Sequence, residues 1–347
     1  MKRTHFWAIG LALLTVLGLA TGCGRSSNAT TSRQTTHIVT DMTGKKVTVP
    51  TRVTRVADLW HANNQVVLLL GGQRRLVATT QLIKQSPWFQ TVNPRIKHVT
   101  APFAGDDLQI EELLKTKPDV VIAADEAQVK KARSAKLPTV NAMYQDFAGL
   151  RKSVTLTAKV LGGTAPKVAD AYQRTLTRNL NTVKRRLRGV TAKPKVLHIV
   201  NATNLNQVDG RGTIVDEWIK AAGGQNALKQ SGNMISVTTE QLAKANPDVI
   251  IVGSTTTAKA QRALRQNPVL RKLTAVKHGR VYGNPQGTFP WDRYSAEEVL
   301  QVLWAAKKLH PAQFRGLNMV SETQAFYQKY YHYHLSQTQA QQMLNGK

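Results

Sequence analysis

One long amphipathic segment in the middle of the chain, residues 165–188, limits the possible folds more than any other feature. Pro166 lies in its expected first turn and Gly189 follows its last basic residue, as is common at helix ends. A helix of this length spans roughly 36 Å, about the width of a small domain. The segment therefore predicts a stiff connection between two parts of the protein. Its apolar residues recur every three or four positions, the spacing of one helical stripe, and they are Val168, Tyr172, Leu176, Leu180, Val183 and Leu187.

The sequence before this segment is similar to the sequence after it. The twelve residues from Glu111, EELLKTKPDVVI, align without a gap with the twelve from Glu240, EQLAKANPDVII. Gly-Gly-Gln at 71–73 recurs at 223–225, each time after a predicted helix. Two matches in the same order indicate a duplicated lobe. Strand patterns alternate with helical patterns in both halves. We therefore predict an α/β fold of two lobes, each with a mainly parallel sheet flanked by helices, joined by one long helix.

The N-terminus has the order of residues that is typical of an export signal. Lys2 and Arg3 precede an apolar run over 8–20, which is too short to span a bilayer but suits the core of a signal peptide. The run ends in Leu-Ala-Thr-Gly-Cys, which resembles the lipobox of bacterial lipoproteins, although that family prefers Leu at the position of Ala20. In the lipobox the cysteine becomes the lipidated N-terminus. Cys23 is the only cysteine, so no internal disulfide is expected.

These features predict five parts of the chain. Residues 24–36 are polar and rich in Ser and Thr, with few side chains that could be buried, which is typical of a flexible tether. We expect a signal peptide over 1–22, a lipid-anchored flexible tether over 23–36, an N-terminal α/β lobe over 37–160, the connecting helix over 161–189 and a C-terminal α/β lobe over 190–347.

The chain is strongly basic, with 48 Lys and Arg against 20 Asp and Glu and a formal charge of +28. Such a charge is typical of proteins that bind nucleic acid, an anionic surface or an anionic ligand. The export signal argues against nucleic acid. An anionic membrane, a cell-wall polymer, an anionic ligand and a merely solvated surface all remain as explanations.

Several further segments carry a resemblance to a known family. They are DMTG at 41–44, VTVP at 47–50, both Pro-Asp-hydrophobic repeats, FPWDRYS at 289–295, WAAKKLHP at 304–311 and FYQKYY at 326–331. With the lipobox, they resemble the substrate-binding lipoproteins of ABC importers, in the class for iron complexes, siderophores and cobalamin. The resemblance covers roughly residues 37–345. It implies the periplasmic-binding fold with a helical backbone.

The resemblance also implies a function. We expect a monomeric, non-enzymatic receptor without a cofactor, anchored through Cys23 to the outer face of the bacterial cytoplasmic membrane. It would capture a chelated metal, foremost a ferric siderophore-type complex, and deliver it to the permease. Molybdate, a nickel chelate, heme and cobalamin are the alternative ligands. A lipid-anchored hydrolase and a cell-surface adhesin are the rivals from other classes, and the sequence lacks the GxSxG motif of many hydrolases.

Candidate ligand residues follow predicted strands, because open parallel sheets bind ligands beyond the carboxyl ends of their strands. Aromatic rings could stack on a ligand, His could bind metal or donate to an anion, and Arg offers a fixed fork of donors. Each has a structural alternative: Trp60 and Trp291 as core, His61 as a helix cap, Asn204 in a plain turn, and Arg293 paired with Asp292. The candidates are Trp60, His61, Asn204, Trp291, Arg293 and Tyr294.

Glu111 and Glu240 occupy equivalent places in the two repeats, seven residues before the proline and in the first turn of a predicted helix. A carboxylate there is favourable by a few tenths to about 1 kcal/mol, which could alone explain both residues. In the resembled receptors, one glutamate on each lobe at this spacing meets an arginine pocket of the permease. The resemblance therefore implies that Glu111 and Glu240 dock the receptor.

The lipobox resemblance predicts that Cys23 carries the membrane anchor. A Cys23→Ser variant should appear in the released fraction or stay unprocessed, because serine offers no thiol for lipidation. Fractionation and intact-protein mass spectrometry of both proteins measure this. A variant that remains membrane-bound and processed like wild type would show that the lipoprotein interpretation is wrong.

Overall fold

The computed structural model describes residues 35–347, which belong to one contact unit of the chain. The predicted signal peptide, Cys23 and nearly all of the tether lie outside the described residues. Within 35–347, no helix combines the length and the apolar character needed to cross a membrane.

The N-terminal lobe is a parallel four-stranded sheet preceded by a hairpin. Its strand order is β4-β3-β7-β8, and all three pairings are parallel. The hairpin turn is closed by Asp41, whose carboxylate accepts hydrogen bonds from the backbone N–H groups of Thr43 and Lys45 at 2.9 and 3.0 Å. The strands are β1 (Thr36–Thr40), β2 (Lys46–Pro50), β3 (Val56–Asp58), β4 (Leu76–Ala78), β5 (Phe103–Ala104), β6 (Asp107–Leu108), β7 (Val120–Ala123) and β8 (Thr139–Asn141).

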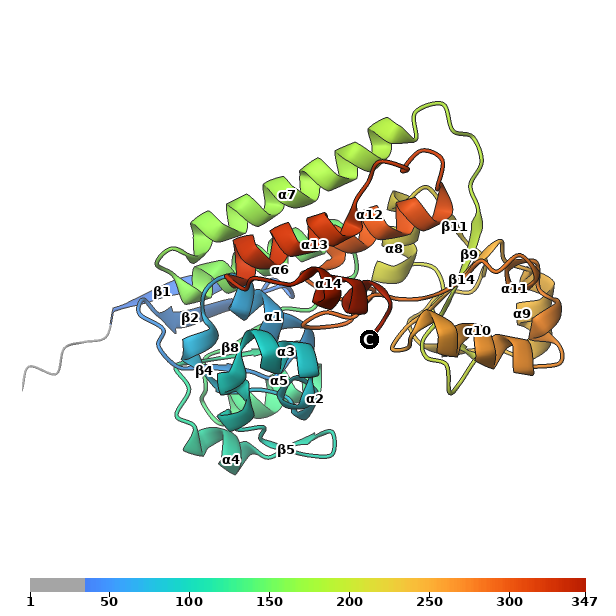
Figure 1. The fold of residues 1–347 in the computed structure, drawn as a ribbon. Helices are drawn as coiled ribbons and strands as arrows, with labels where there is room; N and C mark the ends of the chain where they lie inside the picture. The colour runs from blue at the N-terminus through green and yellow to red at the C-terminus, as the bar shows by residue number, and fades with distance from the viewer. Residues whose placement is uncertain (1–34) are drawn as a thin grey trace, which may run out of the picture. The chain divides into compact units, whose positions relative to one another are not determined.

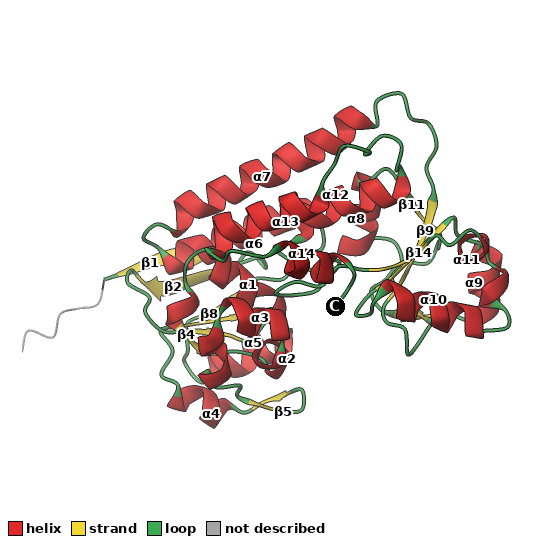
Figure 2. Ribbon diagram, in the orientation of Figure 1, coloured by secondary structure: helices red, strands yellow, loops and turns green. Residues whose placement is uncertain are grey.

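Helices lie on both faces of this sheet (Figure 2). The α-helices are α1 (His61–Leu69), α2 (Gln81–Gln85), α3 (Pro87–Val92), α4 (Ile110–Lys115), α5 (Glu126–Ser134) and α6 (Phe147–Leu161), with 3-10 turns at Gln73–Arg75 and Pro94–His98.

The predicted connecting helix is α7 (Ala165–Arg186), which ends two residues earlier than its sequence pattern indicates. Of its apolar stripe, Tyr172, Leu176 and Val183 are buried and the other three residues are partly buried. The helix packs against α6 of the N-terminal lobe and against α12 (Glu298–Leu309). The Tyr172 hydroxyl donates to the Ala296 carbonyl at 2.9 Å, and Asn179 Nδ2 donates to the Val299 carbonyl at 2.7 Å. Figure 1 shows α7 running alongside both lobes.

The C-terminal lobe has a six-stranded sheet of order β12-β10-β9-β13-β14, in which β11 also pairs with β9. The pairings of β9 with β11 and β13, and of β13 with β14, are parallel, whereas β10 and β12 are antiparallel additions at one edge. The predicted mainly parallel sheets and the two-lobed α/β fold are therefore confirmed. The strands are β9 (Lys195–Ile199), β10 (Gln207–Val208), β11 (Gln225–Asn226), β12 (Ile235–Ser236), β13 (Val249–Val252) and β14 (Val281–Gly283).

The remaining helices cover this sheet and then return toward the N-terminal lobe. Trp88 of α3 donates its indole N–H to the Lys347 carbonyl at 2.7 Å, so the last residues contact both lobes. The helices are α8 (Ile214–Ala221), α9 (Thr239–Ala245), α10 (Thr257–Gln266), α11 (Thr274–Lys277), α13 (Met319–Phe326) and α14 (Gln337–Leu344), with a 3-10 turn at Leu270–Lys272 and a π-helical turn at Tyr327–Tyr331.

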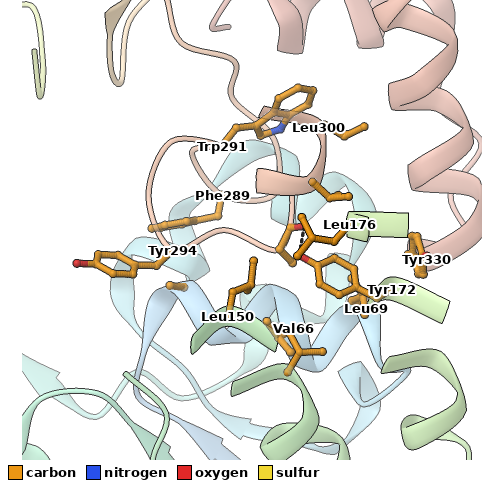
Figure 3. Packing of buried hydrophobic residues seen from close by; sticks show 14 of the residues in the cluster. Val66, Leu69, Leu150, Tyr172, Leu176, Phe289, Trp291, Tyr294, Leu300 and Tyr330 are labelled. Carbon is orange, nitrogen blue, oxygen red and sulfur yellow. Dashed lines mark hydrogen bonds between the residues drawn. The ribbon is translucent and has the colours of Figure 1, made fainter. Parts of the chain in front are cut away.

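One hydrophobic core extends through both lobes. It includes Val66 and Leu150 of the N-terminal lobe, Leu176 of α7, Trp291 of the loop before α12 and Leu300 of α12 (Figure 3). Each sheet has one further, smaller core on the face turned away from the large core. Because the large core is shared, the segment between β14 and α12 is held by residues of both lobes.

Candidate ligand-binding site

The first wall of the candidate site comes directly after β3, where the sequence predicted it. Trp60 follows this strand, and His61 is the first residue of α1. The Trp60 backbone N–H donates to Asp58 Oδ1 at 3.2 Å, and Asn63 Nδ2 donates to Asp58 Oδ2 at 2.9 Å. Burial raises the pKa of the Asp58 carboxyl well above its usual value. The buried Asp58 carboxyl therefore fixes the turn that carries Trp60 and His61.

Three aromatic rings meet at the junction of the lobes. The ring centroids of Trp60 and Tyr144 are 5.6 Å apart, those of Trp60 and Tyr294 are 5.8 Å apart, and those of Tyr144 and Tyr294 are 5.5 Å apart. Such edge and tilted contacts between aromatic rings are favourable. The Tyr294 hydroxyl also donates to Gln145 Oε1 at 3.0 Å, so the loop before α12 is tied to the end of β8. The structure thus brings together two predicted residues, Trp60 and Tyr294, and both are buried in the large core, as the structural alternative for Trp60 stated.

Tyr144 and Gln145 were missed in the sequence interpretation, although they follow β8 in the way that Trp60 follows β3. The same rule about strand ends could have found them. Burial raises the pKa of the Tyr144 phenol well above its ordinary value. Within the described residues this buried hydroxyl has no hydrogen-bond partner, which is unusual for a buried polar group.

His61 stacks on Phe289 across the junction. Their ring centroids are 5.1 Å apart and the planes are inclined by 29°. Burial of His61, and then the positive charge of Arg293, lower the pKa of the imidazole to about 4. His61 is therefore neutral near pH 7, with a nitrogen lone pair available to a metal or a donor. Figure 3 shows Phe289 and Tyr294 on the same loop.

Arg293 is anchored in the C-terminal lobe. Its Nη2 donates to Asp209 Oδ2 at 2.6 Å, its Nη1 donates to Asn233 Oδ1 at 3.3 Å, and its side chain is 14% exposed. The alternative in which Asp292 pairs with Arg293 is wrong, because Asp292 Oδ2 lies 2.7 Å from His198 Nε2. Asp209, which binds Arg293, and His198, which contacts Asp209, were both missed. The available signal was a lone histidine within the apolar strand at 195–199.

Two predicted ligand residues lie away from these rings. Trp291 is fully buried and points into the core toward Leu300, as its structural alternative stated (Figure 3). Phe289 and Tyr294 of the same loop contact His61 and Trp60 of the N-terminal lobe, whereas Trp291 does not. Asn204 is exposed in a turn, where the Asn201 carbonyl side chain accepts its backbone N–H at 2.8 Å. Among the described residues, Asn204 forms hydrogen bonds only within 201–207.

Glu111 and Glu240 lie in the first turns of α4 and α9, and both are exposed. Each of these helices directly precedes a central strand of its own sheet, so the two residues are equivalent in the two lobes. The pKa of Glu240 is lowered by hydrogen bonds from its own backbone N–H and from Thr238. In α4 the neighbouring Glu112, not Glu111, pairs with Lys115 at 2.6 Å.

A basic hollow of about 560 Å³ lies elsewhere in the N-terminal lobe, and its lining includes Arg55, Arg95 and His98. It is at the amino ends of the strands, since Arg55 directly precedes β3. The Arg55 guanidinium is already used by the Thr116 and Lys117 carbonyls. We therefore place the candidate site at the carboxyl ends, where the aromatic rings and Arg293 converge.

Comparison with known proteins now adds to this geometry. The family model described as "Periplasmic binding protein" matches residues 56–287. The uncharacterised ABC transporter substrate-binding lipoprotein YvrC of Bacillus subtilis is 24% identical, over 81% of this chain and 89% of that protein. The iron(3+)-hydroxamate-binding protein YxeB of the same species is 21% identical, over 87% and 96%.

A third relative is similar in both sequence and structure. The molybdate-binding protein MolA of Haemophilus influenzae is 23% identical, over 85% of this chain and 91% of that protein. Its structure with bound molybdate has a TM-score of 0.76, covering 86% of this chain and 99% of that one, at 20% identity. At this identity the structural likeness establishes the fold alone.

The contact between the lobes makes a prediction for His61. Its imidazole should titrate near pH 4, and Arg293→Gln should raise this midpoint because it removes the second cause of the lowered pKa. The pKa of His61 is lower in the folded protein than in the unfolded chain, where it is about 6.5. His61 therefore reduces the stability of the folded state as pH falls from about 6.5 toward the pKa in the folded protein. NMR of the imidazole ring protons measures the midpoint. Arg174→Gln, an exposed arginine on α7, is the charge-matched control and should leave it unchanged. A wild-type midpoint near 6.5 would contradict this placement of His61.

Proposed function

Because the chain belongs to the periplasmic binding protein family, we propose that it captures a chelated metal between its lobes and delivers it to the permease of an ABC importer. A ferric siderophore-type complex is the ligand that we infer. The receptor would be held on the outer face of the cytoplasmic membrane through Cys23. The single observation that carries the proposal is the convergence of aromatic rings, neutral His61 and anchored Arg293 at the junction of the lobes.

The composition of this site favours a bulky complex with anionic oxygens. Trp60, Tyr294 and Phe289 supply flat apolar faces, which account for most of the contact area in sites for organic ligands. Arg293 supplies one oriented cation, suited to carboxylate or similar oxygens. The Tyr144 hydroxyl, buried without a partner among the described residues, would gain one from such a ligand. A relative named as binding iron(3+)-hydroxamate agrees with a ferric complex.

A second candidate ligand is an oxyanion such as molybdate. It is favoured by the similarity to a molybdate-binding protein and by Arg293 beside His61. A small oxyanion would use the polar groups but would not need the rings of Trp60 and Phe289 for contact. Substitution of His61 by alanine distinguishes the candidate ligands, because it should weaken the binding of a nickel chelate or an oxyanion more than the binding of a bulky siderophore complex.

The ligand is identified by native mass spectrometry with elemental analysis of the purified protein, followed by titration with ferric citrate, ferrioxamine and molybdate.

Arg293→Ala should weaken the binding of an anionic ligand about thirty-fold or more, since losing a charge-assisted contact costs roughly 2 to 5 kcal/mol. Arg174→Gln is the control for net charge. Unchanged affinity in a correctly folded Arg293→Ala protein would show that this arginine is structural. Failure of every metal complex and oxyanion to bind would overturn the proposed function.

We also propose that Glu111 and Glu240 dock the receptor on the permease. They are exposed, equivalent and one on each lobe, which matches a permease of two subunits. On a chain of charge +28, one exposed glutamate on each lobe would also orient the encounter by electrostatic complementarity.

Substitution of both glutamates by alanine should nearly abolish uptake of radiolabelled ferric complex by cells, while ligand affinity in solution stays the same. Each single change should have a smaller effect, and substitution by arginine should be worse because like charges would then face each other. Glu112→Ala, the adjacent residue of α4, is the matched control and should leave uptake normal. Normal uptake by the folded double variant would leave only the helix-dipole explanation for these residues.

A further inference from the structure

A buried histidine in the C-terminal lobe has two carboxylate partners. His198 of β9 lies beside Asp209, which directly follows β10, and both side chains are fully buried. His198 Nδ1 is 2.8 Å from Asp209 Oδ2, and His198 Nε2 is 2.7 Å from Asp292 Oδ2. Ionised carboxylates only accept hydrogen bonds, so both ring nitrogens carry hydrogen when both carboxylates are ionised. The geometry is therefore that of an imidazolium between two carboxylates.

The same chain of contacts reaches the candidate ligand site. Asp209 Oδ2 also accepts from Arg293 Nη2 at 2.6 Å, and Asp209 Oδ1 accepts from the Met234 backbone N–H at 2.9 Å. The order is Asp292, His198, Asp209 and Arg293, with two negative and two positive charges. Loss of the charge on His198 would leave an excess negative charge buried directly behind Arg293, and buried unbalanced charge is strongly unfavourable.

We propose that His198 is a positioning residue for ligand capture, which balances Asp209 and Asp292 so that Arg293 stays fixed and its charge acts on an anionic ligand. This inference rests on the proposed function, since it concerns the same site. It goes further by assigning a net negative charge to the part of the ligand that meets Arg293. A neutral residue at position 198 would make the site repel such a ligand.

The electrostatics of the surroundings agree with this role. Burial alone would lower the pKa of His198, but the hydrogen bonds and charges of Asp209 and Asp292 outweigh burial and raise it. Burial likewise opposes ionisation of Asp209, yet His198 and Arg293 lower its pKa. Two further carboxyl groups lie nearby, Glu298 of α12 beside Asp292 and Glu217 of α8 beside Glu298. Burial raises the pKa of both, that of Glu298 well above its ordinary value, and so disfavours a negative charge on them.

The element packed over the imidazole adds no charge at the contact. Trp218 of α8 meets the His198 ring with centroids 5.9 Å apart, and its indole N–H donates to the Asp292 carbonyl at 3.2 Å. The pKa of His198 is higher in the folded protein than in the unfolded chain, where it is about 6.5. The stability that the protonated imidazole contributes is therefore complete below about pH 6.5 and is lost as pH rises through the pKa in the folded protein. Anion binding should weaken over that same rise.

The test uses the full-length protein, two iron complexes of opposite charge, and a variant that restores the charge balance. His198→Gln should weaken binding of anionic ferric citrate by about tenfold or more, because a unit charge change near Arg293 in a protein interior is a large perturbation. It should leave cationic ferrioxamine B equally well or better bound. His198→Gln combined with Asp292→Asn removes one charge of each sign and should recover binding of ferric citrate.

Asp292→Asn alone gives an independent readout if His198→Gln does not fold. It keeps the imidazole and removes a negative charge, so ferric citrate should bind at least as tightly as to wild type and ferrioxamine B less tightly. Equal weakening of both complexes by His198→Gln, no recovery in the folded double variant, or weaker citrate binding by Asp292→Asn would each overturn the proposal.

A second readout needs no ligand and separates this inference from the proposed function. If His198→Gln displaces Arg293, the titration midpoint of His61 should rise, and it should return toward the wild-type value in the double variant. If no complex binds to wild type, the proposed function fails while the His61 titration still decides whether His198 positions Arg293. A midpoint that stays the same in folded His198→Gln would show that His198 has no such role.

Discussion

The buried face of α7 packs against the start of α12, and the loop that carries the candidate site depends on this contact. Tyr172 and Asn179 of α7 hold the carbonyl groups of Ala296 and Val299, which lie just before and within the first turn of α12. From the other side, the Ser295 hydroxyl donates to Gln65 Oε1 of α1 at 3.1 Å. The loop is thus fixed by the connecting helix and by the N-terminal lobe, although it follows a strand of the C-terminal lobe.

A buried glutamate closes the same loop on itself. Glu297 Oε1 accepts from the Thr288 hydroxyl at 2.6 Å and from the Tyr327 hydroxyl at 2.9 Å. Burial raises the pKa of Glu297 to about 7, and these hydrogen bonds oppose the rise. Gly287 lies against the Glu297 carboxylate, where a Cβ atom would collide with it. The two ends of the loop are therefore joined by one side chain, and a fixed loop can hold Phe289, Arg293 and Tyr294 in one arrangement.

Charge is distributed unevenly in this protein. The surface is basic, whereas the interior behind the candidate site is rich in carboxyl groups, among them Asp209, Asp292 and Glu298. A single arginine and a single histidine balance Asp209 and Asp292, and burial raises the pKa of Glu298 and so disfavours its negative charge. The positive charge that reaches the junction of the lobes is consequently one guanidinium with a defined direction, which is a more selective feature than the general basicity of the chain.

Periodicity and repetition in the sequence determined the architecture. A stripe of apolar residues every three or four positions has to be buried along a helix, which fixed α7, and the repeat around Glu111 and Glu240 fixed two similar α/β lobes. The rule that ligands bind beyond strand ends located Trp60 and His61, and it would have located Tyr144.

Sequence spacing did not decide which side chains of the loop over 289–294 face the junction. Trp291 points toward Leu300 in the core, Tyr294 packs on Trp60 and Tyr144, and Asp292 turns to His198 instead of to its neighbour Arg293. Those directions follow from contacts with residues about 80 to 230 positions away, such as Asp209 and Gln65. Only the tertiary structure decides them, because a local sequence pattern carries no information about partners that meet through folding.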